Sequence, residues 1–83
     1  MAFRISSHAQ EELVRRRIPP PVLQAVLDHP EQIVPEREGR KAYQSRHRID
    51  DIMFLVRAIV DDRSDPVAVV TVYRTTKIAK YWR

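Results

Sequence analysis

Hydrophobic and polar residues follow two different periods along this chain of 83 residues, and the change falls at Pro30. Before Pro30 the apolar positions recur at the 3.6-residue spacing of amphipathic helices. Phe3 to Ser6 is compatible with a short first strand, and Ser6 or Ser7 can then cap a helix that runs to about Arg17. The segment IPPPVLQAVLDHP predicts a second helix, because proline is tolerated in a first helical turn and Pro30 ends it.

After Pro30 the period is two, which is typical of strands. Gln32 to Val34 is compatible with a short strand. Ala42 to Ile49 has the alternation of a strand, with one face made by Tyr43, Ser45 and His47 and the other by Gln44, Arg46 and Arg48. Ile52 to Val60 is apolar almost throughout, which suits a central strand covered on both faces. Val67 to Tyr73 is a further strand, and Asp50-Asp51 and the DDRSDP segment predict the turns between these strands.

The order of these elements is β-α-α-β-β-β with a short basic tail. It predicts an α+β fold in which two N-terminal helices pack on one face of a small antiparallel sheet. A chain of this length forms a single domain, here residues 1–83. The packing leaves the other face of the sheet open.

Arg57 lies in the middle of the most apolar strand, with Leu55 and Ile59 as neighbours on its own face. A buried guanidinium without a partner is costly. Arg57 therefore either pairs with a carboxylate or faces a polar groove, and the sequence alone leaves both alternatives open.

The composition excludes several classes of protein. The chain has no cysteine, no apolar run near the roughly 20 residues of a membrane span, and no apolar segment of a signal peptide. We therefore expect a cytoplasmic protein that does not enter a membrane. Glycine occurs once, at Gly39, so a glycine-rich phosphate loop is excluded and no cofactor is expected.

The net charge is +4, and twelve of the fifteen cationic residues are arginine. Arginine binds phosphate through a planar fork and stacks on bases, so this bias favours a polyanionic partner such as RNA. A GC-rich genome, which raises arginine content everywhere, explains the same bias without a functional role.

On the first predicted helix, His8, Glu12, Arg15 and Arg16 share a polar side that faces away from the core. One interpretation is a solvated face with weak ion pairs. The other is a histidine that titrates near neutrality beside arginines that hold a phosphate. If His8 and the tail share one reaction, the tail must fold back beside this helix and the open sheet face.

The tail carries cations and rings at regular spacing: Arg74, Lys77, Lys80, Tyr81 and Trp82. Cations with aromatic rings hold single-stranded nucleic acid by phosphate contact and stacking. The alternative is a basic terminus whose rings cover the edge of the core.

No metal site is expected, because His8, His29 and His47 lack the spacing of metal ligands. RNA cleavage does not require a metal. The ribose 2′-hydroxyl can attack the adjacent phosphate if a base, an acid and cations are in place.

Two stretches, SHAQEELVRRRI and VVTVYRTTKIAKYW, resemble a bacterial domain-of-unknown-function family with the pattern HAxxRxxxRGI…VxTVYRTxKxxKYW. That family is similar to RelE/ParE-type toxins of toxin–antitoxin modules and to small microbial ribonucleases. The resemblance implies a RelE/ParE-like sheet whose concave face, with helix and tail residues, forms a site for RNA or a target protein. The positions that match the family pattern are His8 and Arg16 in the helix and Thr71, Tyr73, Arg74, Lys77, Lys80 and Tyr81 in the tail.

This chain departs from the family pattern at two positions. Glu12 stands where the pattern has arginine, and Arg17 stands where it has glycine. A left-handed helix cap at Arg17 would be strained, so the cap is either strained or absent.

The first hypothesis is therefore the toxin component of a toxin–antitoxin module that cleaves RNA without metal. Its expected partners are RNA, including ribosome-bound mRNA, and a cognate antitoxin. The predicted catalytic residues are His8, Arg16, Lys77 and Tyr81. The predicted RNA-binding residues are Arg46, Arg57, Tyr73, Arg74, Lys80 and Trp82. The alternatives are a non-enzymatic ParE-like inhibitor that binds a protein and an RNA-binding accessory domain.

Overall fold

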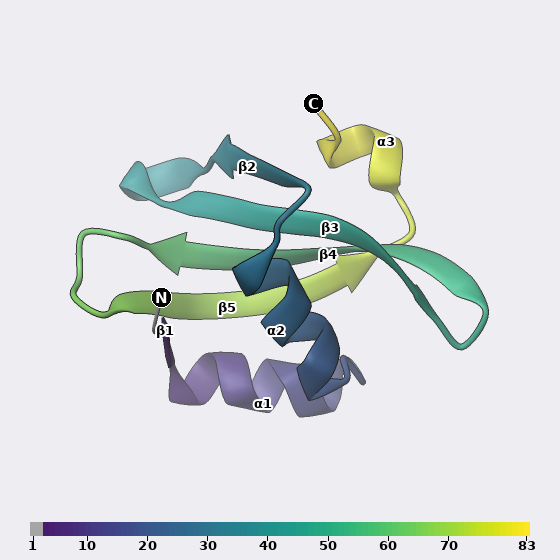
Figure 1. The fold of residues 1–83 in the computed structure, drawn as a ribbon, viewed down its shortest axis with the longest axis horizontal. Helices are drawn as coiled ribbons and strands as arrows, with labels where there is room; N and C mark the ends of the chain where they lie inside the picture. Colours follow the sequence, from purple (N-terminus) through teal and green to yellow (C-terminus); the bar gives the residue numbers. More distant parts are fainter. Residues whose placement is uncertain (1–2) are drawn as a thin grey trace.

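The computed structural model describes residues 3–83, which form one five-stranded sheet with helices packed against it (Figure 1). The elements in chain order are β1 (Phe3–Ile5), α1 (Ser7–Arg15), α2 (Pro20–Asp28), β2 (Gln32–Pro35), a 3-10 turn η1 (Arg37–Gly39), β3 (Lys41–Ile49), β4 (Ile52–Asp61), β5 (Val67–Thr75) and α3 (Ile78–Tyr81). The predicted α+β class is confirmed. The predicted order β-α-α-β-β-β leaves out the short strand that the sequence allows at Gln32 to Val34, which the structure forms as β2. It also lacks the short helix α3 in the tail.

The sheet is mixed, whereas the sequence pattern predicted an antiparallel one. The strand order is β1-β5-β4-β3-β2, and β1 runs parallel to β5 with Phe3 opposite Val67 and Ile5 opposite Val69. The other neighbouring strands are antiparallel. The pattern missed the parallel pair because three residues of alternation carry no information on strand direction.

The β3–β4 hairpin closes through the two-residue turn predicted at Asp50-Asp51. Both aspartates have positive φ, 51° and 64°. Such a turn matches the right-handed twist of the flanking strands. It also fixes the register, so that Ile49 pairs with Ile52 and Gln44 pairs with Arg57.

Helix α1 has a defined cap at each end. Ser6 is its N-cap, and the Ser6 side chain accepts a hydrogen bond from the Ala9 amide at 3.0 Å. At the other end the Arg17 amide donates to the Val14 carbonyl and the Ile18 amide to the Leu13 carbonyl. This pair of backbone hydrogen bonds is a Schellman cap. Arg17 occupies its left-handed position, with a φ of 54°. The cap is therefore present, and an arginine holds a conformation that favours glycine.

One core cluster joins both N-terminal helices to the sheet. Ala9 of α1 and Val26 of α2 are fully buried in the same cluster as Val56, Ala58 and Val60 of β4. These three β4 residues are two apart, so their side chains lie on one face of the strand. Burial of this face is the main apolar contribution to folding.

The opposite face of the sheet carries a much smaller apolar cluster and the tail. Val34, Ala42 and Ile59 form this second cluster, with Tyr73 packed against it. Figure 1 shows α3 beside β2 and β3, at the other end of the strand order from α1. Within residues 3–83, none of the helices is long and apolar enough to cross a lipid bilayer.

Candidate functional site on the open sheet face

Four polar side chains lie in one row across the sheet. Gln32 pairs with Gln44, Gln44 with Arg57, and Arg57 with Tyr73, each on a different strand from β2 to β5. Residues paired in this way present their side chains to the same face. That face is the one opposite Val56 and the helices, because adjacent residues of a strand alternate. We call these four residues the polar row.

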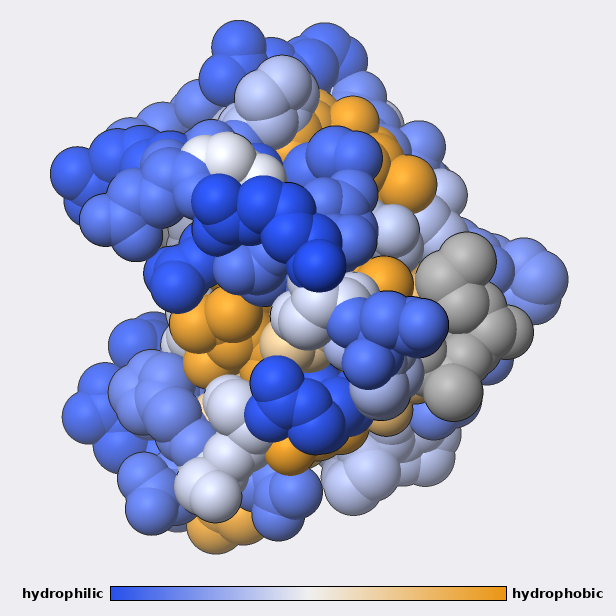
Figure 2. All heavy atoms as spheres, turned by 90° about the vertical axis from the view of Figure 1, so that its left-hand side faces the viewer, coloured by the Kyte–Doolittle hydropathy of each residue, from blue (hydrophilic) through white to orange (hydrophobic). Residues whose placement is uncertain are grey.

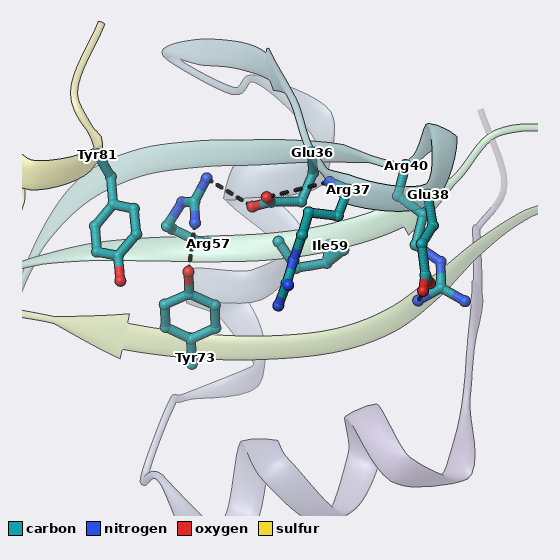
Figure 3. Close-up of a pocket in the computed structure, with 8 residues that line it drawn as sticks. All are labelled: Glu36, Arg37, Glu38, Arg40, Arg57, Ile59, Tyr73 and Tyr81. Atoms are coloured by element: carbon teal, nitrogen blue, oxygen red, sulfur yellow. Dashed lines mark hydrogen bonds and ion pairs between the residues drawn. The ribbon is translucent and has the colours of Figure 1, made fainter.

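Arg57 is the centre of the polar row and is almost fully buried, with 4% of its surface exposed. Its Nε donates to Gln44 Oε1 at 2.8 Å, and its two terminal nitrogens contact the Tyr73 hydroxyl and Glu36 Oε2, the latter at 3.2 Å. Figure 3 shows Glu36, Tyr73 and Tyr81 gathered around this guanidinium. Both alternatives left open by the sequence hold, since Arg57 pairs with a carboxylate and also faces a pocket.

Aromatic rings complete the surroundings of Arg57. The Cζ atom of Arg57 lies 4.4 Å from the centroid of the Tyr81 ring and 5.6 Å from that of Tyr73. The two rings meet edge to face, with centroids 6.2 Å apart. Arg16, from the end of α1, lies 5.9 Å from the Tyr73 centroid. Cations over ring faces are attracted by the ring quadrupole, so these contacts hold the tail against the sheet.

The pKa of the Tyr73 hydroxyl is shifted by its surroundings on this face. Burial raises the pKa of Tyr73 above 10.0, and the hydrogen bond from Arg57 opposes this rise without cancelling it. Tyr73 is therefore protonated throughout the neutral range, and Arg57 fixes the orientation of its oxygen.

A pocket of about 490 Å³ opens at this site. It is lined by Glu36, Arg37, Glu38, Arg40, Arg57, Ile59, Tyr73 and Tyr81. Seen from the end that carries the β4–β5 loop, the surface is mostly hydrophilic and is hollowed on one side, where hydrophobic atoms are visible (Figure 2). The pocket combines two carboxylates, two phenols and three guanidiniums, which are the kinds of group that acid–base chemistry on a phosphate ester needs.

The tail is tied to the sheet through its backbone. Gln44 Nε2 donates to Gln32 Oε1 at 2.8 Å and to the Tyr81 carbonyl at 3.2 Å. Gln32 exchanges two further hydrogen bonds with Arg83, as its Nε2 donates to the Arg83 carbonyl at 2.6 Å and its Oε1 accepts from the Arg83 amide at 3.2 Å. These bonds place α3 over β2 and β3 on the open face.

Arg46 and Trp82 form a second aromatic contact beside the polar row. The Arg46 guanidinium lies 4.3 Å from the Trp82 centroid. The same guanidinium donates two hydrogen bonds to Glu31, from Nε to Oε1 at 3.2 Å and from a terminal nitrogen to Oε2 at 3.1 Å. The hydrogen bonds from Arg46 lower the pKa of Glu31 below its usual value. Arg46 and Trp82, two of the residues predicted to bind RNA, thus lie together, and Trp82 is half-buried.

His8 is not brought to the tail. It is exposed in the first turn of α1, where Ser6 bonds to the Val69 carbonyl, whereas Tyr81 lies over Arg57 at the level of Tyr73. His8 and Arg16 share a side of the helix, but eight residues separate them by about 12 Å along its axis. The helix carries Arg16, not His8, to the edge of the open-face site, and a catalytic role for His8 stays a prediction.

Glu12 joins the polar side of α1 in place of the arginine of the family pattern. It is buried and bonds with Arg15 Nε at 2.9 Å and Arg16 Nε at 3.2 Å. Burial alone would raise the pKa of Glu12, but the hydrogen bond from Arg16 and the charge of Arg15 lower it overall. Glu12 therefore holds two arginines in place rather than contributing a cation.

The remaining predicted residues lie around the tail. Lys77 and Lys80 are exposed, and Lys80 Nζ lies 5.3 Å from the Tyr81 centroid. The Lys77 amide donates to Thr75 Oγ1 at 3.0 Å, which turns the chain out of β5.

Arg74 pairs with Val56, so its side chain leaves on the helix side of the sheet and lies 4.4 Å from the Phe54 centroid. Arg74 is therefore separated from Tyr73, its neighbour in sequence, by the sheet itself.

Sequence reasoning missed Glu36 and Gln44, two of the three side chains that hold Arg57. Gln44 could have been found, because a two-residue turn at 50–51 places it opposite Arg57. Glu36 lies in a charged segment between β2 and β3 whose conformation no simple pattern specifies. No group of three or more histidine, cysteine, aspartate or glutamate side chains in residues 3–83 is arranged to hold a metal ion.

Comparisons of the chain with family models, with curated proteins and with solved structures find no match.

Proposed function

We propose that this protein is a RelE/ParE-like toxin that cleaves RNA at the open-face pocket without a metal ion. The observation that carries the proposal is that one buried guanidinium, that of Arg57, holds both a carboxylate and a phenol in the same pocket. A base and an acid on either side of a phosphodiester are what cleavage by the ribose 2′-hydroxyl requires. The basic composition and the resemblance to the toxin family support the same reading.

In the proposed reaction Glu36 takes the proton of the ribose 2′-hydroxyl, whose oxygen then bonds to phosphorus. The bond between phosphorus and the 5′-oxygen breaks, and Tyr73 gives its proton to that oxygen. The products are a 2′,3′-cyclic phosphate and a 5′-hydroxyl. Solvent exchange then restores the proton to Tyr73 and removes it from Glu36.

Arg57 is a positioning residue in this scheme, since each of its three nitrogens has a partner within the protein. Charge on the phosphoryl oxygens is stabilised by the cations near the pocket, of which Arg37 and Lys80 are exposed and Arg16 and Arg40 are half-buried. Arg16 lies beside Tyr73, Arg37 and Arg40 line the pocket, and Lys80 lies beside Tyr81.

Tyr81 covers Arg57 and keeps water from the guanidinium contacts. Arg46 and Trp82 supply a stacking surface for a base.

The proposal is tested by incubating the purified protein with RNA in EDTA, with and without ribosomes, and identifying the new ends. Cleavage that persists in EDTA and leaves 2′,3′-cyclic phosphates supports it. Cleavage that stops in EDTA and leaves 3′-hydroxyl ends contradicts it. Expression together with the product of a neighbouring small gene tests the expected antitoxin, which should relieve any growth arrest. The proposed setting is the cytoplasm, where ribosome-bound mRNA is the expected substrate.

A second candidate function is a non-enzymatic ParE-like inhibitor that binds a protein. It is favoured by Val14 of α1, whose apolar side chain is 80% exposed beside a pocket lined by Leu13, Ile18 and Pro19. Growth arrest on expression without cleavage of any RNA would favour this candidate. Salt-sensitive RNA binding without either effect would instead favour an accessory RNA-binding domain.

A further inference from the structure

A second pocket, outside the open-face site, lies where α1 ends beside the end of β5. Its volume is about 610 Å³. It is lined by Arg15, Arg16, Arg17 and Arg74, with Phe54 and two threonines. The four arginines come from two segments that are more than fifty residues apart, so the cluster is a product of the fold. We call these four residues the arginine cluster.

The cluster keeps a strong positive charge. Glu12 is paired with Arg15 and Arg16, and both contacts use the Nε atoms, so the terminal nitrogens of these guanidiniums are not part of them. Within residues 3–83, Arg17 and Arg74 take part in none of the ion pairs. Even with Glu12 counted, three positive charges remain in excess, which favours a bound anion.

Arg17 occupies this cluster at a conformational cost. Its φ of 54° is in the left-handed region, where glycine is the favoured residue of a helix cap. An unfavourable conformation of this kind, at a residue that lines a charged pocket, points to a role for the side chain. The common structural role of arginine at a helix end is to complement the helix dipole. That role accounts for Arg15 and Arg16 but not for Arg74, which comes from β5.

The arginine cluster adjoins the open-face site through Arg16. Arg16 lines the second pocket, and its guanidinium also lies 5.9 Å from the Tyr73 centroid. Tyr73 and Arg74 are consecutive in β5 and leave the strand on opposite faces. β1 pairs with β5 only as far as Val69, so the edge of β5 that carries these two residues is free of β1. A chain of phosphates can therefore cross this edge and contact both pockets.

We propose that the arginine cluster is a phosphate-binding subsite for the RNA strand, which holds a phosphodiester adjacent to the one that reacts at Tyr73. The proposal rests on the proposed function, because RNA is the ligand that would link the two pockets. The two pockets make separable contributions. The open-face site supplies the acid and base, whereas the arginine cluster supplies affinity and fixes which phosphate reaches them.

The test uses a fluorescein-labelled 2′-O-methyl oligoribonucleotide, which has phosphates but no 2′-hydroxyl to attack, so binding is measured apart from cleavage. Its Kd is determined over a series of potassium chloride concentrations for the full chain. Arg74→Ala and Arg17→Gly should each raise the Kd by about tenfold, the effect of losing one charge-assisted hydrogen bond. Each should also flatten the salt dependence by roughly 0.7 in the slope of log K against log salt.

The matched control is Arg4→Ala, which removes the same charge from an exposed position on β1. Arg4 pairs with Ala68, six residues along β5 from Arg74, or about 20 Å. Arg4→Ala should leave the slope unchanged. Equal losses in all three variants would show a diffuse effect of net charge and overturn the subsite. Thermal unfolding of Arg17→Gly provides a second readout, because a purely structural Arg17 predicts lower stability and a binding Arg17 does not.

Two further outcomes separate this inference from the proposed function. If Arg74→Ala and Arg17→Gly bind the oligonucleotide as the unchanged chain does while RNA is still cleaved, the subsite is wrong and the nuclease proposal stands. If both variants lose binding and no RNA is cleaved, the subsite stands and the nuclease proposal fails. Binding of inorganic phosphate that Arg74→Ala abolishes, together with oligonucleotide binding that Arg74→Ala leaves unchanged, would assign the cluster to a free anion and overturn the inference.

Discussion

Gln44 and Arg57 face each other across the β3–β4 hairpin, and the side-chain oxygen Oε1 of Gln44 accepts a hydrogen bond from Arg57 Nε at 2.8 Å. Gln44 is fully buried, and its side-chain nitrogen Nε2 donates to Gln32 Oε1 and to the backbone carbonyl of Tyr81. One side chain therefore orients the central guanidinium and fastens the tail over it. The position and rigidity of the open-face site depend on this contact.

Replacing Gln44 with methionine should lower the free energy of unfolding by about 1–3 kcal/mol, because buried polar groups lose their partners. The groups affected are Arg57 Nε, Gln32 Oε1 and the Tyr81 carbonyl. Urea denaturation followed by circular dichroism measures the change. The matched control is Gln24→Met on the exposed side of α2, which should change stability by less than about 0.5 kcal/mol. Equal effects of the two substitutions would contradict a structural role for Gln44.

Arg17→Gly should raise the free energy of unfolding by about 0.5–1 kcal/mol, because glycine adopts the left-handed cap without the steric cost paid by arginine but loses more entropy on folding. The hydrogen bonds of the cap are made by backbone groups and remain in the variant. Glu11→Gly, at an exposed position inside α1, should instead lower it by about 1 kcal/mol. A less stable Arg17→Gly would mean that the arginine side chain contributes more to folding than its backbone conformation costs.

Asp61 should govern part of the acid dependence of stability. Two hydrogen bonds from the Arg63 guanidinium, each 2.9 Å long, and one from its amide lower the pKa of Asp61 from 3.8 to about 2. The folded state therefore binds its proton less readily than the unfolded state, and the contribution of Asp61 to stability is present above pH 3.8 and is lost as the pH falls toward 2.

Denaturation midpoints measured from pH 5 to pH 2 test this, with Asp61→Asn as the variant and Asp65→Asn, exposed in the loop that follows β4, as the control. Asp61→Asn should lose stability at pH 5 and show a weaker acid dependence. An acid dependence identical to that of the unchanged chain would contradict the assignment.

Tyr73 should ionise above its ordinary pKa. Burial raises its pKa above 10.0, so the folded state keeps its proton where the unfolded state has begun to lose it. The contribution of Tyr73 to stability is present below pH 10 and is lost as the pH rises through the folded pKa. Absorbance titration of tyrosinate measures this, and Tyr73→Phe should remove a component that titrates above pH 10. Loss of that component in Tyr43→Phe instead would assign it to the other side of the sheet.

The sequence predicted those features that depend on local periodicity and turn chemistry. The two N-terminal helices, the long strands and the turn at Asp50-Asp51 follow from neighbouring residues. The same local pattern indicates that Arg57 needs a carboxylate partner or a polar groove. The parallel pairing of β1 with β5 was missed, because Phe3 and Val67 are joined only through the folded sheet. Local patterns carry no information about such distant contacts.

The candidate site was predicted in part, for identifiable physical reasons. Tyr73, Tyr81 and Arg57 were named and lie together. His8 was grouped with the tail because proton-transfer groups that share one reaction must lie near the same phosphate. A local sequence pattern does not say which end of α1 lies beside the tail, and the rise along the helix axis separates His8 from Arg16. The tail lies on the open sheet face, where a shared reaction would require it, but the bonds that dock it could not be predicted. They are made by glutamine side chains that donate to the backbone carbonyls of Tyr81 and Arg83.

The central claim is that Tyr73, held by Arg57, transfers the proton in metal-free RNA cleavage, and its most direct test is the single-turnover cleavage rate in EDTA of Tyr73→Phe. We expect Tyr73→Phe to lower the rate by about 10²–10⁴-fold while the variant remains folded by circular dichroism, because it removes only the hydroxyl. Tyr43→Phe, which packs against Phe3 on the helix side of the sheet, should cleave at the unchanged rate. Full activity of Tyr73→Phe together with loss of activity in His8→Ala would contradict the claim and move the reaction to the first turn of α1.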